Sequence, residues 1–104
     1  MKSTQPVSSE LFVAMMIYHV TEIKKERVWT GKLVNTLQEY MTKLDVHRVL
    51  TVLTDWMIIT GEYGETEKGR GGYLYYIETH DGGDLRIKEL YDKYWVHITG
   101  DNNG

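Results

Sequence analysis

Residues 42–59 read TKLDVHRVLTVLTDWMII, and the fold is deduced from this stretch outward. Its apolar residues follow the spacing i, i+3, i+4 and i+7, which is the spacing of one face of an α-helix. These residues are Val46, Val49, Leu50 and Leu53. Thr42 stands just before them and is a suitable N-cap. We therefore expect an amphipathic helix over residues 42–56 that packs this stripe against a core.

The segments on either side contain further helices and two strands. Helical spacing of apolar residues and capping residues predict the helices, whereas β-branched and aromatic runs flanking a Gly-rich stretch predict a hairpin. The predicted elements are helices 9–24 and 30–39, strands 57–63 and 73–77 around a loop at 64–72, and a last helix at 84–97. Residues 1–8 are expected to be a flexible arm and residues 98–104 a disordered tail.

The order of these elements indicates a single domain over residues 9–97. Three helices, a two-stranded hairpin with a long tip and a final helix form the arrangement of a winged helix-turn-helix. The fold class is therefore α+β, mostly α, with a three-helix core, a two-stranded wing and a C-terminal helix. In this arrangement the third helix is the one that enters a DNA groove.

The sequence of the third helix and the wing resembles PadR-like and MarR-like winged-helix regulators. Val46, Leu50 and Leu53 match their buried positions, and His47 and Arg48 match their exposed positions. The later stretch GRGGYLYYI, residues 69–77, resembles their wing. Two features depart from the pattern. Trp-Met replaces a usual Gly turn at 56–57, and the wing carries three glutamates, Glu62, Glu65 and Glu67.

This resemblance implies a transcriptional regulator that binds double-stranded DNA in a sequence-specific way. The third helix is expected to read base edges, and the second helix and the wing are expected to contact phosphates. Between residues 24 and 48 there are six basic and three acidic side chains, so the basic excess lies where such a fold needs it. The predicted DNA contacts are Lys32, Asn35, Thr42, Lys43, His47, Arg48, Thr51, Lys68 and Arg70.

The composition excludes several other classes of protein. The chain has 104 residues, a formal net charge of −3 and no cysteine, which excludes disulfides, thiolate nucleophiles and zinc ribbons. No apolar run reaches the roughly 18–20 residues of a membrane span. We find no nucleophile elbow, metalloprotease motif or phosphate loop, and no three convergent metal ligands. We therefore expect a cytoplasmic protein that is not an enzyme and holds no metal or cofactor.

Three further expectations concern partners. The last helix carries Leu90, Tyr91, Tyr94 and Trp95, which a small core has difficulty covering, so we expect this helix to form a homodimer interface. Two recognition helices would then lie about 34 Å apart on a palindrome. A small aromatic or phenolic effector held by the dimer between Tyr18, Trp29 and Trp95 would make the protein a ligand-responsive repressor. The acidic wing favours an alternative, a winged helix that binds other proteins and not DNA.

Overall fold

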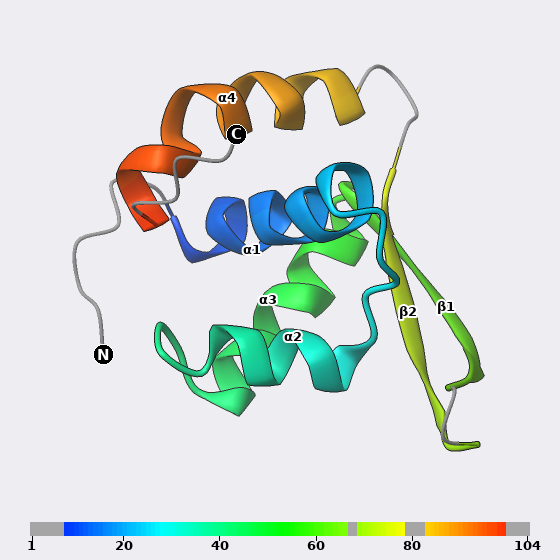
Figure 1. Ribbon diagram of the computed structural model, residues 1–104. Helices are drawn as coiled ribbons and strands as arrows, with labels where there is room; N and C mark the ends of the chain where they lie inside the picture. Colours follow the sequence, from blue (N-terminus) through cyan, green and yellow to red (C-terminus); the bar gives the residue numbers. More distant parts are fainter. Residues whose placement is uncertain (1–7, 67–68, 79–82, 100–104) are drawn as a thin grey trace.

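The computed structural model describes residues 8–66, 69–78 and 83–99. Its elements follow the predicted order, with a short π-helix after the first α-helix (Figure 1). They are α1 (Ser9–Tyr18), η1 (His19–Ile23), α2 (Thr30–Leu37), α3 (Lys43–Asp55), β1 (Ile59–Glu65), β2 (Gly71–Ile77) and α4 (Gly83–Thr99). The predicted contact Lys68, the turn at 79–82, the arm at 1–7 and the tail at 100–104 lie outside the described residues.

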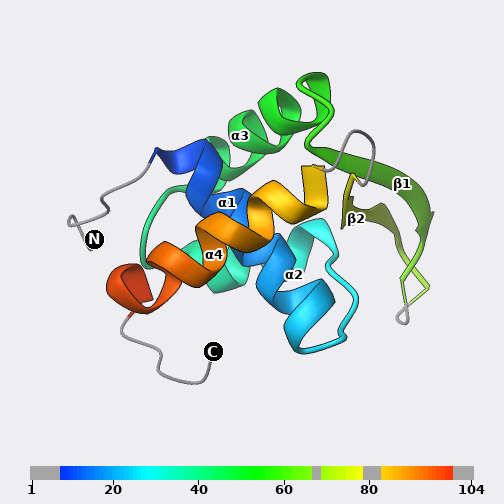
Figure 2. The same ribbon diagram turned by 90° about the horizontal axis from the view of Figure 1, so that it is seen from above.

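Helix α1 is the centre of the molecule. Every residue of this helix from Phe12 to Tyr18 is buried, so the helix is apolar on all sides and is covered on all sides. It packs against α3 on one side and α4 on the other, and Figure 2 shows α4 crossing over it. Ser8 caps its N-terminus, because the Ser8 hydroxyl accepts a hydrogen bond from the Leu11 N–H at 3.1 Å.

The first helix does not stay α-helical to residue 24 as predicted. After Tyr18 it widens into the π-helical turn η1, in which the Thr21 hydroxyl donates to the Ile17 carbonyl at 2.8 Å. Lys25 then adopts a left-handed backbone, with φ of 57°, and ends the helix. A threonine hydroxyl can donate a hydrogen bond to a backbone carbonyl in the preceding turn, and this bond disturbs regular helix geometry. The apolar periodicity of the sequence did not reveal this change.

Helices α2 and α3 form the helix-turn-helix. Thr42 caps α3 as predicted, since its hydroxyl accepts a hydrogen bond from the Asp45 N–H at 3.2 Å. The predicted cap of α2 was wrong. Trp29 occupies the N-cap position without a side-chain bond, and the Thr30 hydroxyl instead reaches the Tyr73 carbonyl at 3.5 Å on the wing.

The end of α3 is closed by a Schellman motif built on a non-glycine residue. The N–H groups of Met57 and Ile58 donate back to the carbonyls of Thr54 and Leu53, each at 3.0 Å. Met57 takes the left-handed position of this motif, with φ of 61°, where glycine is the usual residue. This is the position at which the sequence departs from the Gly turn of the PadR-like and MarR-like pattern.

The wing is an antiparallel hairpin whose strands extend closer to the tip than predicted. The register pairs Ile59 with Ile77 at the base and Glu65 with Gly71 at the tip. The connecting loop is therefore shorter than the predicted stretch 64–72. Ahead of α2, Trp29 forms a bridge with Leu74, so the segment between η1 and α2 pairs with the outer edge of β2.

Helix α4 buries aromatic residues that we expected at a dimer interface. Tyr91 and Trp95 are only 2% and 3% exposed, and their rings stack on each other at 5.1 Å between centroids. The expectation was wrong for these two residues because α1 offers α4 an apolar side that α2 and α3 leave uncovered. Leu90 and Tyr94 are only partly buried. The helix also continues through residues 98–99, which were predicted to be disordered.

Aromatic rings and one histidine link α4 to α1. The His19 Nδ1 lies 2.6 Å from the Tyr91 hydroxyl, and the His19 ring stacks on Trp95 with centroids 4.7 Å apart. The Tyr18 ring lies against Tyr91 as well, at 5.1 Å between centroids. A buried polar ring thus has a hydrogen-bond partner, as polar groups in a core require.

Candidate nucleic-acid interface

The outward face of α3 is a row of exposed side chains opposite its buried stripe. The row has the spacing i, i+3, i+4 and i+7, which places four side chains on one face of the helix. Its members are Leu44, His47, Arg48 and Thr51. His47, Arg48 and Thr51 are predicted DNA contacts, whereas Leu44, which is 78% exposed, was not predicted. The helical spacing from Leu44 to His47 and Arg48 was the signal that could have identified it.

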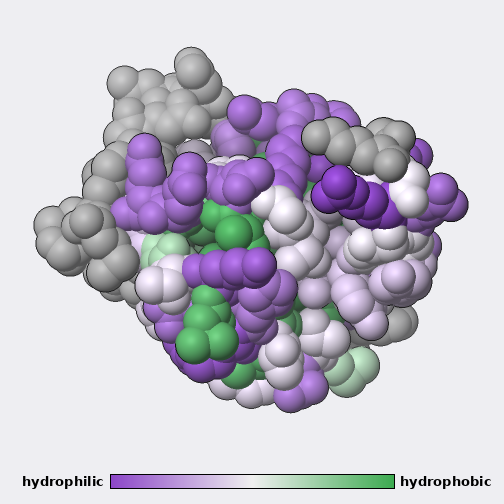
Figure 3. Space-filling model, turned by 90° about the horizontal axis from the view of Figure 1, so that it is seen from below, coloured by the Kyte–Doolittle hydropathy of each residue, from purple (hydrophilic) through white to green (hydrophobic). Residues whose placement is uncertain are grey.

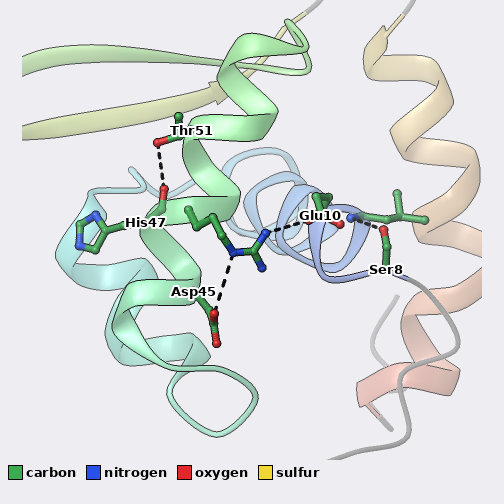
Figure 4. A network of polar contacts seen from close by, with 7 residues as sticks. Ser8, Glu10, Asp45, His47 and Thr51 are labelled. Carbon is green, nitrogen blue, oxygen red and sulfur yellow. Dashed lines mark hydrogen bonds and ion pairs between the residues drawn. The ribbon is translucent and has the colours of Figure 1, made fainter.

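Arg48 does not extend freely from this face. Its Nη1 lies 3.6 Å from Oε2 of Glu10 on α1, and its Nε lies 4.0 Å from Oδ1 of Asp45 (Figure 4). His47, at the edge of the same face, points away from Glu10 (Figure 4). Arg48, one of the predicted DNA contacts, is therefore paired with two carboxylates, while 56% of its side chain remains exposed.

The first turn of α3 combines a backbone cap with a cation. The Thr42 hydroxyl is occupied as the acceptor of the cap hydrogen bond, whereas Lys43 is exposed. A helix N-terminus carries a partial positive charge, to which the Lys43 ammonium adds. This end of the helix is therefore suited to an anionic partner.

A hollow of about 420 Å³ separates α3 from the wing. His47 and Thr51 line it from α3, and Tyr73 and Tyr75 line it from β2. The Thr51 hydroxyl donates to the His47 carbonyl at 3.1 Å, so it has acceptor capacity left for a partner. Burial raises the pKa of the Tyr75 phenol.

A second groove, of about 710 Å³, lies between α2 and the wing tip. It brings together the predicted phosphate contacts Lys32 and Asn35 from α2 and Arg70 from the wing. Lys32 is also hydrogen-bonded to Glu26, and this contact lowers the pKa of the Glu26 carboxyl. Trp29 lines the groove too, and its buried Nε1 has no hydrogen-bond partner among the described residues.

The surface around these groups is mainly polar. Seen from the side of α2 and of the loop that leads into α3, hydrophobic side chains form small separate patches among hydrophilic ones (Figure 3). In the wing, Glu62, Glu65 and Arg70 are all exposed, so the wing presents acidic as well as basic groups. The described part of the chain has no helix with both the length and the apolar character that a membrane crossing requires.

Comparison with solved structures identifies the architecture. The Pex protein from Synechococcus has 22% sequence identity and a TM-score of 0.58, with 86% of this chain and 83% of Pex covered. A PadR-like transcriptional regulator from Bacillus cereus has 17% identity and a TM-score of 0.61, with 88% and 84% covered. The chain has a PadR-like winged-helix fold. Neither a protein-family model nor a curated protein matches the sequence.

One solved PadR-like structure includes nucleic acid. Bacillus subtilis PadR, crystallised in complex with operator DNA, has 13% identity to this chain and a TM-score of 0.55. The match covers 77% of this chain and 47% of that protein. At these identities the likeness establishes the PadR-like fold, whose third helix and wing are the elements that carry the candidate interface described above.

The three residues expected to enclose an aromatic effector do not line one pocket within this chain. Trp29 lines the groove beside the wing, whereas Trp95 lines a different hollow beside His19. Tyr18 is buried against Tyr91. The expectation of one site between these residues is therefore not met within a protomer, because α1 separates the wing side of the molecule from α4.

Proposed function

We propose that the protein is a transcriptional regulator that binds double-stranded DNA and reads the major groove with the outward face of α3. The observation that carries this proposal is the exposed row formed by Leu44, His47, Arg48 and Thr51. A helix of 13 residues is about 20 Å long and fits a groove about 12 Å wide. The PadR complex with operator DNA supports this use of the fold.

Phosphate contacts in the proposal come from three places. Lys43 lies at the N-terminus of α3, where the helix dipole also favours an anion. Lys32, Asn35 and Arg70 share the groove between α2 and the wing tip. Lys68 remains part of the proposal by its position in the wing sequence. These contacts would orient the protein, and the outward face of α3 would supply base recognition.

Fluorescence anisotropy with a mixed-sequence duplex tests the proposal. Binding should weaken steeply between about 50 and 200 mM salt, because phosphate contacts release counterions. Arg70→Ala should weaken binding to all duplexes alike and reduce the salt slope by about 1. Arg86→Ala removes the same charge from an exposed position on α4 and should leave binding nearly unchanged. Absence of binding at low salt would refute the proposal.

A second candidate function is a protein-interaction module without DNA binding. It is favoured by the exposed Glu62 and Glu65 in the wing and by the pairing of Arg48 with Glu10. Like charges next to phosphates would lower DNA affinity. The anisotropy measurement separates the two candidates, since only the regulator requires salt-dependent duplex binding. We propose a cytoplasmic location with either function, and neither function assigns the protein a catalytic role.

A further inference from the structure

We propose that Leu44 is a specificity residue that recognises the C5-methyl group of a thymine in the major groove. This inference rests on the proposed DNA binding. Leu44 is the most exposed large hydrophobic side chain that the structure describes, at 78%, and it lies in the first turn of α3. A leucine exposed to solvent at this position has no role in the core. The residues that α3 contributes to the core lie on the opposite face of the helix.

Leu44 lies near the N-terminus of α3, in the first turn of the helix. In helix-turn-helix proteins the N-terminal residues of the recognition helix contact the base edges. Leu44 follows Lys43 directly and lies one turn before His47 and Arg48 on the same face. A phosphate contact by Lys43 would therefore hold the leucine side chain toward the groove floor.

The surroundings of Leu44 favour a small apolar target over a protein partner. The rest of its row is polar, namely His47, Arg48 and Thr51. Single exposed apolar side chains do not make the contiguous patches that mark protein interfaces. The thymine methyl is the apolar group that a base-pair edge presents in the major groove, so contact with Leu44 would favour thymine over the other bases.

The ion pairs that hold Arg48 make the contact between Leu44 and a thymine methyl more important for specificity. Glu10 and Asp45 both draw the guanidinium away from an extended conformation, so an arginine–guanine contact requires these ion pairs to break. Leu44 has no comparable restraint to overcome. Removing a methyl group from such a contact should weaken binding about fourfold, the value expected for one buried methylene.

Uracil substitution tests the inference. The preferred duplex is first selected from a random pool, and each thymine is then replaced by uracil, which lacks the methyl but keeps the base pair. In the wild type, replacing one particular thymine in each half-site should lower the affinity of the protein for the duplex about fourfold. In Leu44→Ser the same replacement should have no effect. Leu85→Ser, at another exposed leucine on α4, should retain the thymine sensitivity.

The outcomes separate this inference from the proposed function. If the duplex binds with salt dependence but no uracil replacement matters, or if the sensitivity survives in Leu44→Ser, the role of Leu44 is refuted and DNA binding stands. A preferred duplex that contains no thymine would likewise refute the role of Leu44 and leave DNA binding standing. If no duplex binds at low salt, both proposals are refuted.

Discussion

The Nη1 atom of Arg48 on α3 lies 3.6 Å from Oε2 of Glu10 on α1. This ion pair connects the outward face of the third helix to the central helix of the core. Exposed pairs of this kind contribute about 0–1 kcal/mol to folding stability, because solvent screens them. The main consequence of the pair is therefore competition, since the N–H donors that face Glu10 are not available to a DNA partner while the pair holds.

Glu10→Gln is expected to strengthen duplex binding. The substitution removes the charge that holds Arg48, so affinity should rise a few-fold at low salt and less at high salt. Stability should change by less than about 1 kcal/mol. Anisotropy titrations at two salt concentrations measure the effect. Glu89→Gln makes the same change in net charge on α4, and an equal gain there would show that overall charge alone is responsible.

Met57→Gly is expected to stabilise the protein. Met57 has φ of 61° and is 66% exposed, so glycine relieves the left-handed backbone and loses little buried surface. The gain should be about 1 kcal/mol, or about 4–8 °C in Tm for a domain of this size. Thermal unfolding measures it. Met57→Ala removes the side chain without relieving the backbone, and an equal gain in that variant would contradict the explanation.

Tyr91→Phe is expected to destabilise the contact between α1 and α4. The variant keeps the aromatic ring but removes the hydroxyl that lies 2.6 Å from Nδ1 of the buried His19. A buried polar group that loses a partner costs about 1–2 kcal/mol. Urea unfolding at neutral pH checks this value. Tyr94→Phe, on the partly exposed side of the same helix, should change stability much less, and comparable losses would point to a general effect of phenol removal.

We propose that α4 also forms a homodimer through its partly exposed side, where Leu90 and Tyr94 lie one turn apart. Sedimentation at micromolar concentration should then show a dimer. Leu90→Glu places a charge in the interface and should shift the protein to a monomer. Leu85→Glu, at a more exposed position on α4, serves as the control. A wild-type monomer at this concentration would rule the dimer out.

The parts of the fold that depend on local pattern were predictable. The stripe of Val46, Val49, Leu50 and Leu53 located α3, and all four residues are buried. Thr42 marked the start of that helix through its capping chemistry. Most of the predicted contact residues also lie on the expected elements, since a helical period places exposed side chains as well as buried ones.

The errors concern contacts between segments that are distant in the sequence. Tyr91 and Trp95 were assigned to a partner subunit because periodicity does not show that α1 has a second apolar side free to receive them. The pairing of Arg48 with Glu10 joins two helices that lie apart in the chain. The wing tip is tighter than predicted because the strand register continues to Glu65 and Gly71.

The amino-acid sequence by itself determined the order of the elements, the buried face of α3 and its N-terminal cap, since these depend on spacing and on hydrogen bonds between near neighbours. Only the tertiary structure decided which aromatic residues are internal, which cations are already paired and how the wing meets α2. Those features arise where separate elements compete for the same apolar surface or the same charge, and the outcome is settled when the helices pack together.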